Sequence, residues 1–354
     1  HTSKLCFPVN LKSQLLHMKF LNRLLKWLGI LLFIFTIVYL LGPNPSTPTY
    51  TTQLPAVPAD ADSLENYIKA NEAQHKLRPN NEARIIWAND SLKTKTEYAI
   101  VYLHGFSASQ EEGSPVHVNV AKKFGCNLYL ARLAEHGIDT TEQLVNLTAE
   151  KYWNSVKQAY AIGKQIGNNV IIMGTSTGGT NALHLASVYP EIHALVLLSP
   201  NIEIFDDNAW IANNPWGLQL GKLITGSGYV TPKDNRDIYK QYWNYHYRLE
   251  SIANLQEYLE TTMLPHTFKQ VKQPTLMLYY YRDAVHQDSV VKVSAMKKMY
   301  EQLSTPPALK REQAMPNTGD HVIGSYIKSG DVVGVEAEIT KFMMQVLKLP
   351  LTQQ

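Results

Sequence analysis

Hydrophobic and polar positions divide the chain into an apolar N-terminal stretch and a long region of short alternating elements. From residue 60 onward, apolar runs typical of buried strands alternate with stretches typical of helices. Strands are expected at 83–88, 97–103, 127–133, 169–174, 194–199, 275–281 and, with a weaker pattern, 308–314; helices are expected at 62–75, 116–124, 148–166, 178–188, 289–302 and 331–347. This alternation predicts an α/β fold with a mostly parallel sheet and helices on both faces.

One segment interrupts the alternation. Residues 201–268 contain no strand pattern and are rich in Trp and Tyr, so they are expected to form an insertion in the domain. In parallel sheets covered on both faces, ligands bind beyond the carboxyl ends of the strands. Functional side chains are therefore expected just after the predicted strands.

The N-terminal apolar stretch is long enough to cross a membrane. Residues 20–42, about 23 in number, would form a helix roughly 34 Å long, and the hydrocarbon core of a bilayer is about 30 Å thick. Lys19, Arg23 and Lys26 lie at its start, and no charge follows until Asp60. This bias predicts a single-pass anchor with the N-terminus in the cytoplasm and the rest of the chain on the outer side.

A cleaved signal peptide and a buried soluble helix are the alternatives to an anchor. The Gly42-Pro43-Asn44-Pro45 sequence lacks a small-x-small cleavage site, and a buried helix would have no polar face. Within the basic segment 1–19, residues 1–17 precede Met18 and are expected to be either upstream translated sequence or a non-native addition. The proline-rich linker 43–59 is expected to be a stiff spacer, followed by the globular domain at 60–350.

Charge and cysteine content narrow the function classes. The net charge is +3, but five of the 33 Lys and Arg residues lie within 1–42, leaving 28 against 30 acidic residues in the remainder. No basic stripe with interleaved aromatic residues indicates nucleic-acid binding. The two cysteines exclude a disulfide framework, and no metal or phosphate-binding motif occurs, so no cofactor is expected.

The sharpest chemical signal is Gly174-Thr-Ser176-Thr-Gly178, which follows a buried strand and opens a predicted helix. A tight strand-to-helix turn exposes the serine hydroxyl above the edge of the sheet, and the small neighbours let strand and helix approach closely. The pattern predicts that Ser176 is a nucleophile. An ordinary glycine-rich turn is the alternative interpretation.

A nucleophilic serine needs a base and a carboxylate that orients the base. His321, in Gly319-Asp-His321-Val, follows the weak strand at 308–314 and is the expected base. Asp283 follows the strand at 275–281 and is the favoured carboxylate. Asp288 is the alternative, although it could instead cap the helix at 289–302. The resulting chain order is Ser, Asp, His.

With these motifs in place, the sequence resembles the α/β-hydrolase superfamily over residues 83–347. The resemblance includes Leu103-His-Gly-Phe106, the serine turn, an Asp-x-Val after a late strand and Gly-Asp-His-Val near the end. It implies that the backbone N–H groups of Phe106 and Thr177 form an oxyanion hole, and that 201–268 is the family's cap. The chain lacks the His-Gly-Gly-Gly form of many lipases and is closer to small carboxylesterases and monoacylglycerol lipases.

The resemblance implies a serine hydrolase that acts on carboxylic esters through an acyl-enzyme. A peptidase, a thioesterase, another hydrolase on this scaffold, or a non-catalytic binding member are the alternatives. The cap aromatics are expected either to line an acyl pocket or to form the cap's own core; they are Trp210, Trp216, Tyr229, Tyr239, Tyr242, Trp243, Tyr245 and Tyr247. The expected partners are an ester substrate and a membrane.

Overall fold

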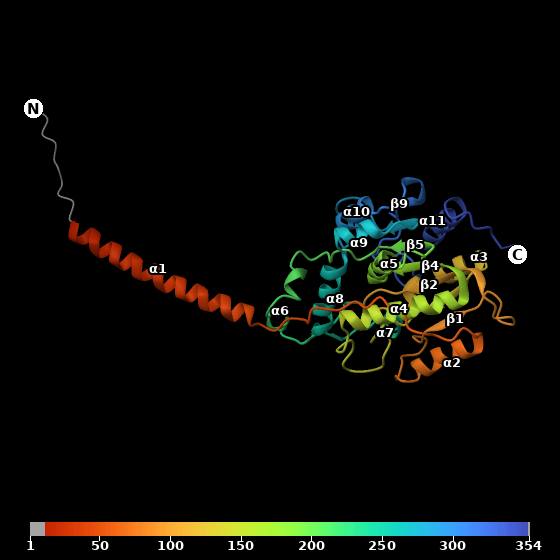
Figure 1. Ribbon diagram of the computed structural model, residues 1–354, viewed down its shortest axis with the longest axis horizontal. Coiled ribbons are helices and arrows are strands. Elements are labelled where there is room, and N and C mark those ends of the chain that lie inside the picture. The colour runs from red at the N-terminus through yellow and green to blue at the C-terminus, as the bar shows by residue number, and fades with distance from the viewer. Residues whose placement is uncertain (1–10, 353–354) are drawn as a thin grey trace, which may run out of the picture.

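The structure, a computed structural model, describes residues 11–352. The first ten residues of the predicted basic segment 1–19 therefore lie outside the described residues. Helix α1 (Leu11–Leu40) contains the predicted apolar stretch and projects away from the rest of the chain (Figure 1). Its segment 14–40 has a mean hydropathy of 1.9 and no side chain buried within the protein, so α1 is a candidate membrane span.

A seven-stranded sheet forms the centre of the domain. Its strand order is β1-β3-β2-β4-β5-β8-β9, and every neighbouring pair is parallel except β1 with β3. The strands are β1 (Arg84–Ile86), β2 (Thr96–Leu103), β3 (Asn127–Leu130), β4 (Gly167–Thr175), β5 (Ala194–Leu198), β8 (Thr275–Tyr279) and β9 (Lys310–Ala314). The predicted mostly parallel sheet is confirmed, with strand ends that differ by a few residues.

Helices cover both faces of the sheet. They are α2 (Ala61–Glu72), α3 (Val116–Lys123), α4 (Ala149–Ile166), α5 (Thr177–Val188), α9 (Pro265–Gln270), α10 (Val293–Gln302) and α11 (Val332–Gln345). Alternate side chains of β2 enter separate cores, with Val101 packed in the core that includes α4 and α5, and Tyr102 packed in the core that includes α3 and α11. This alternation follows from the period of two along a strand.

The insertion between β5 and β8 forms a cap over one end of the sheet. It contains α6 (Gly217–Thr225), α7 (Asp237–Tyr242) and α8 (Leu249–Thr262). The expectation that 201–268 lacks strands is wrong in one detail, because β6 (Tyr229–Val230) and β7 (Tyr247–Arg248) pair in a small antiparallel ribbon. Two-residue strands leave no periodic pattern in a sequence, so hydropathy alone could not predict them.

Residues 43–58, here called the strap, belong to the linker 43–59, which is expected to be a stiff spacer. The strap is extended, but it lies against the domain rather than standing between the domain and α1. Tyr50 packs edge-on against Trp153 of α4 and Tyr258 of α8, at ring-centroid distances of 6.3 and 5.8 Å. The Trp153 indole and the Tyr189 hydroxyl donate hydrogen bonds to the carbonyls of Thr51 and Thr52, each at 2.7 Å. The prolines keep the strap extended, and side chains of the domain satisfy its backbone.

The join between α1 and the strap is also tightly packed. Trp216 donates its backbone N–H to the Pro43 carbonyl at 3.0 Å and its indole N–H to the Val38 carbonyl at 2.8 Å. Gly42 is buried beneath this indole, and a Cβ atom added there would collide with the ring. The end of α1 is thus in direct contact with the residue that precedes α6.

Candidate active site

Ser176 occupies a strained turn between β4 and α5. Its φ and ψ angles are 56° and −121°, in a region that residues with a side chain rarely adopt. The Ser176 N–H donates to the Leu198 carbonyl at 2.9 Å, and the Ser176 carbonyl accepts from the Asn201 N–H at 2.9 Å. These bonds to the end of β5 and the following loop fix the turn from both sides.

Two glycines make this turn sterically possible. A Cβ atom added at Gly178 would collide with the Leu103 carbonyl at the end of β2, and one added at Gly174 would collide with the Gly178 carbonyl. Because α5 begins at Thr177, the Thr177 N–H is one of the backbone donors that a helix N-terminus leaves free. The glycines of the predicted motif therefore bring β2, β4 and α5 together around the serine.

His321 is held by a buried carboxylate. Its Nδ1 lies 2.5 Å from Asp288 Oδ2, and Asp288 is completely buried. The other oxygen, Asp288 Oδ1, accepts the N–H groups of Val290 and Val291 at 2.8 and 3.0 Å. A carboxylate can only accept, so Nδ1 carries the proton and the neutral ring presents Nε2 as an acceptor.

The protonated form of His321 is favoured despite its burial. Burial by itself lowers the pKa of this imidazole, but the charge of Asp288 and its hydrogen bond outweigh that effect, and the pKa is raised above its ordinary value. Nε2 is buried and has no hydrogen-bond partner within residues 11–352. A proton accepted at Nε2 would therefore be stabilised by the carboxylate on the far side of the ring.

The favoured carboxylate, Asp283, does not contact His321, and this preference is corrected in favour of Asp288. Asp283 is half-exposed. Its carboxylate closes a local turn: it accepts the backbone N–H groups of Val285 and His286 and lies 2.9 Å from the His286 ring nitrogen Nδ1. The loop after β8 folds back through a bridge between Tyr281 and Gln287. As a result, Asp283 lies at the exposed tip of the loop. Asp288 lies back at the end of β8, where its backbone N–H donates to the Tyr280 carbonyl at 3.1 Å.

The sequence contained a signal for this alternative. Asp288-Ser-Val290 has the same Asp-x-Val form as Asp283-Ala-Val285. Asp288 does not cap α10, because this helix begins only at Val293 and the residue that precedes it is Lys292. Asp283 is nearer than Asp288 to the end of β8 along the sequence. The loop is a hairpin, however, so it is Asp288 that reaches His321.

Ser176 and His321 line one cavity of about 400 Å³ at the carboxyl ends of the strands. Phe106 and Thr177 line the same cavity, so the structure brings four of the five predicted site residues together. The Phe106 N–H has no hydrogen-bond partner in the described part of the chain. The arrangement offers a nucleophile, a base and two backbone donors around one space.

Two buried histidines hold the loop that carries Phe106. His104 Nε2 accepts the Leu133 N–H, and His136 Nε2 accepts the Ser107 N–H, each at 3.0 Å. Burial lowers the pKa of His104 to about 4 and that of His136 well below its ordinary value, so both rings are neutral acceptors at neutral pH. The expectation that His104 fixes this loop agrees with its contacts. His136 was not singled out from the sequence, although it follows β3 within a short loop.

Glu112 is a further site residue that the sequence patterns did not indicate. Its carboxyl group is buried, lines the cavity and accepts the Gly105 N–H at 2.5 Å. A Cβ atom added at Gly105 would lie 2.8 Å from Glu112 Oε1 and 2.9 Å from Ser176 Cβ, so the carboxyl adjoins the nucleophile. Burial raises the pKa of Glu112 to about 8. The group is therefore a neutral acid at neutral pH and adds no negative charge beside the serine.

Some cap aromatics line the cavity, Tyr242 is buried outside the cavity lining, and others are exposed and serve neither expected role. Tyr239, Trp243 and Tyr247 line the cavity, and Tyr239 stacks on Trp243 with a centroid distance of 5.1 Å. Trp210 and Trp216 are largely exposed and lie outside the cavity lining. Across the described residues, no three His, Cys, Asp or Glu side chains are placed to hold a metal ion.

Comparisons with known proteins agree with this architecture. Among solved structures, a metagenome-derived lipolytic enzyme aligns with a TM-score of 0.59 over 76% of this chain and 99% of its own, at 15% identity. The chain has the α/β-hydrolase fold. A putative non-heme bromoperoxidase from Mycobacterium tuberculosis aligns with a TM-score of 0.52 (77% of this chain, 98% of its own, 13% identity), and a monoacylglycerol lipase from Paleococcus ferrophilus with 0.50 (74%, 97% and 13%).

Among curated proteins, the α/β-hydrolase chain is similar to a thermostable monoacylglycerol lipase from Bacillus sp. strain H-257. The two are 30% identical over 105 residues, which cover 30% of this chain and 41% of that lipase. No protein-family model matches the chain. Because the named neighbours include both lipases and a bromoperoxidase, the fold alone does not select a reaction.

The buried Glu112 makes the stability of the protein depend on pH. Glu112 ionises near its ordinary value of 4.5 when unfolded but at about 8 when folded, so between these values the unfolded state binds fewer protons. Stability is therefore lost as pH rises through this window. We expect Glu112→Gln to show a smaller fall in Tm between about pH 6 and about pH 9 than the unsubstituted protein, measured by tryptophan fluorescence.

Glu111→Gln serves as the matched control, because this neighbouring side chain is only partly buried. The control should show the same fall in Tm as the unsubstituted protein. Equal falls in all three proteins would contradict a neutral, buried Glu112.

Proposed function

We propose that the chain is a serine hydrolase that cleaves carboxylic esters through an acyl-enzyme. The observation that carries the proposal is the convergence of Ser176, the Asp288-held His321 and two free backbone donors on one cavity. The lipase and esterase relatives make esters the favoured substrate class.

In the acylation step, Ser176 Oγ attacks the ester carbonyl carbon while His321 Nε2 takes the hydroxyl proton. The Phe106 and Thr177 N–H groups donate to the oxygen as it becomes negative. The bond from carbonyl carbon to alcohol oxygen then breaks, and Nε2 returns its proton to the departing alcohol. Asp288 stabilises the imidazolium that exists between these two transfers.

In the deacylation step, water replaces the departed alcohol. Nε2 takes a proton from the water, the resulting oxygen attacks the acyl carbon, and the bond to Ser176 Oγ breaks. The proton passes from Nε2 to Oγ, which restores the enzyme and releases the acid. Water is the only co-reactant in this sequence.

The cavity suits a substrate with an apolar acyl group. Its cap side is lined by Tyr239, Trp243 and Tyr247, with Ile252 and Leu255 of α8 adding aliphatic surface. Its volume of about 400 Å³ is within the range of small-molecule sites. The substrate class that we propose is an ester of a short or medium-length acyl chain, with monoacylglycerols as one candidate group because of the Bacillus relative.

The first test measures hydrolysis of p-nitrophenyl acetate, butyrate, octanoate and palmitate, and of a monoacylglycerol, by the full chain in detergent. We expect turnover that Ser176→Ala abolishes, together with loss of fluorophosphonate labelling, because no other group supplies the attacking oxygen. Fluorophosphonate labelling without any ester turnover would favour the peptidase or thioesterase alternative. Labelling that persists in Ser176→Ala would contradict the nucleophile assignment.

A second test separates the two aspartates. In Asp288→Asn, the amide oxygen can still accept the Val290 and Val291 N–H groups, but the charge that orients His321 is lost. We expect kcat to fall by about 10³- to 10⁴-fold, as in other triads that lose this charge. Asp283→Asn should retain kcat within about twofold, because its side chain serves only an exposed turn. A reversed pattern would restore Asp283 as the carboxylate.

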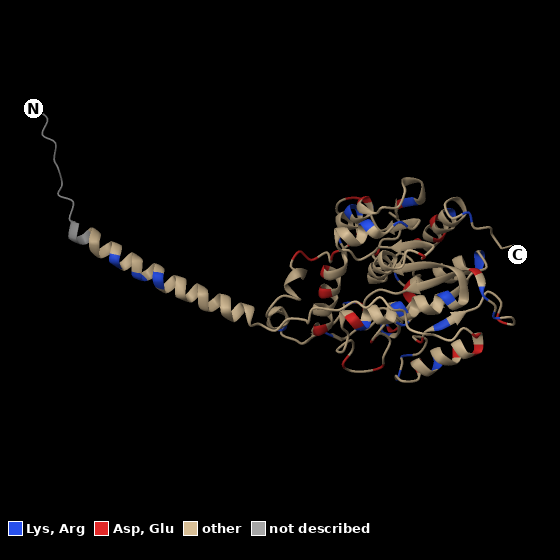
Figure 2. Cartoon of the chain, viewed as in Figure 1, with Lys and Arg blue, Asp and Glu red and all other residues tan. Residues whose placement is uncertain are grey.

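We also propose that α1 anchors the hydrolase on the outer side of a membrane. The charged residues of α1 are Lys12, Lys19, Arg23 and Lys26, and the rest of the helix, from Trp27 to Leu40, carries no charge (Figure 2). Such a distribution favours a cytoplasmic N-terminus, and with one crossing the domain lies outside.

The orientation can be tested with reporters fused after Gln354. Alkaline phosphatase, which becomes active after export, should be active, whereas green fluorescent protein exported in the same position should be dark. The opposite pattern would place the hydrolase domain in the cytoplasm.

A further inference from the structure

The cap carries an apolar surface that stays exposed within residues 11–352. Leu220, Leu223 and Ile224 occupy one side of α6 and are 41%, 79% and 75% exposed; these three side chains are here called the α6 face. Their spacing of three and four residues places them on the same side of a helix. The α6 face is therefore the outer side of an amphipathic element.

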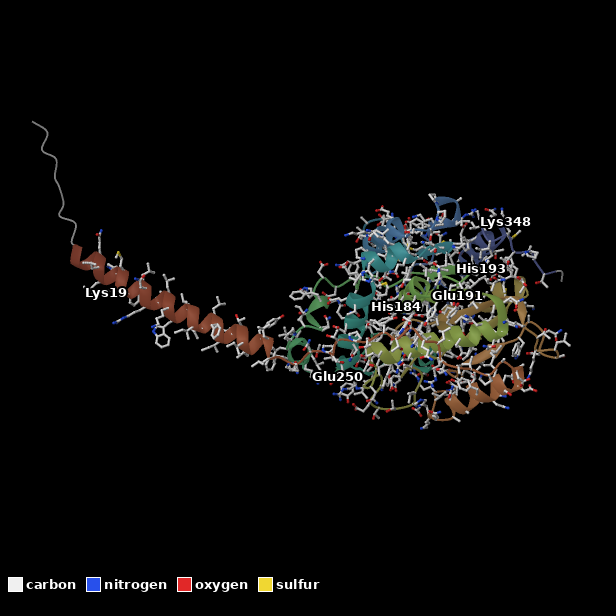
Figure 3. All side chains as sticks on the ribbon, viewed as in Figure 1. Lys19, His184, Glu191, His193, Glu250 and Lys348 are labelled. Carbon is white, nitrogen blue, oxygen red and sulfur yellow. The ribbon has the colours of Figure 1, made fainter. Side chains whose placement is uncertain are left out.

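The opposite side of α6 is tied to the domain. Lys222 lies on that side and pairs with Glu250 of α8 at 2.8 Å. Figure 3 labels Glu250 at the end of the domain next to α1, far from Lys348 at the opposite end. This ion pair lies on the side of α6 opposite the α6 face, in which the Leu223 side chain is 79% exposed.

The α6 face begins where the apolar helix ends. Trp216, the residue before α6, contacts the last turn of α1 through its hydrogen bond to the Val38 carbonyl. In Figure 1, α6 lies at the end of the domain from which α1 departs. Tryptophan is enriched at the height where a membrane span meets water. If α1 crosses a bilayer, Trp216 lies at its surface and α6 starts at the same height.

We propose that the α6 face is embedded in the surface of the same bilayer that α1 crosses, so that the cap rests on the membrane. This inference rests on the proposed anchoring role of α1, but not on the proposed hydrolase chemistry. Amphipathic helices of this kind bury their apolar side at the boundary between headgroups and acyl chains, roughly 5–10 Å deep. The occupant of the surface is thus lipid.

Continuity with the span favours lipid over another protein. The strap and the Gly42–Trp216 contact leave no free tether between α1 and the cap. The α6 face itself carries no charged side chain, so apolar insertion rather than attraction to anionic lipid supplies the binding. A bilayer of zwitterionic phosphatidylcholine is therefore the appropriate probe.

The position of α6 also places the bilayer near the site. Ile252 of α8 lines the apolar groove beside α6 and also the cavity that contains Ser176. The same groove is lined by Leu218 and Ile224 of α6. The groove beside the α6 face and the cavity that contains Ser176 therefore share Ile252 in their linings.

Spin labels can measure the depth of the α6 face directly. The full chain, with Cys6→Ser, would be reconstituted in phosphatidylcholine vesicles with a label at Leu223→Cys, Leu32→Cys or Val333→Cys. Cys126 is buried and stays unlabelled in the folded protein. Leu32 lies in α1, and Val333, on α11, is a matched aliphatic control that is 76% exposed. Relative collision rates with dissolved oxygen and with a water-soluble nickel complex report whether each label is in lipid or water.

We expect the oxygen-to-nickel ratio at position 223 to exceed that at position 333 by at least about threefold, with the ratio at position 32 higher still. A lipid-like value at 32 together with equal values at 223 and 333 would overturn the membrane contact of α6 and leave the anchor intact. A water-like value at 32 would overturn the anchor and this proposal together. Dipolar broadening between labels at 223, without a raised ratio, would show a contact between two copies and also overturn it.

Discussion

The close approach of β4 and α5 at Ser176 is the constraint on which the site depends. The turn requires a positive φ at a residue with a side chain, and that conformation is held by the bonds of Ser176 to Leu198 and Asn201. Gly178 must lie against the Leu103 carbonyl, so the serine turn and the loop after β2 are packed as one unit. Strain of about 1–3 kcal/mol is typical of such a residue, and the surrounding sheet stabilises it.

The same packing explains why the loop after β2 is unusually rich in buried polar groups. This loop leaves the sheet after Leu103, so its backbone groups lack partners from regular structure. His104, His136 and Glu112 supply those partners, and burial keeps all three neutral at neutral pH. Because Glu112 is neutral, the carboxyl group near Ser176 adds no negative charge to the cavity.

The sequence was informative where a residue's role depends on its immediate neighbours. Gly174 and Gly178 signalled the serine turn because their steric role is local, and the apolar runs of β2, β4, β5 and β8 predicted a buried parallel sheet. The preference for Asp283 as the carboxylate failed because the loop from Tyr280 to Asp288 turns back on itself, and side chains within the loop create that turn. His136 and Glu112 act through contacts between distant segments, which neither periodicity nor spacing reports.

The docked strap changes how the anchored domain can move. A free chain of this length would have an end-to-end distance of about 21 Å and would let the domain tumble above the membrane. With Tyr50 packed between α4 and α8 and Gly42 closed under Trp216, that freedom is absent. With α1 in a bilayer, as proposed above, the domain would diffuse only as α1 diffuses and would keep one side toward the lipid. Its encounters with membrane-dissolved molecules would then be a search in two dimensions rather than three.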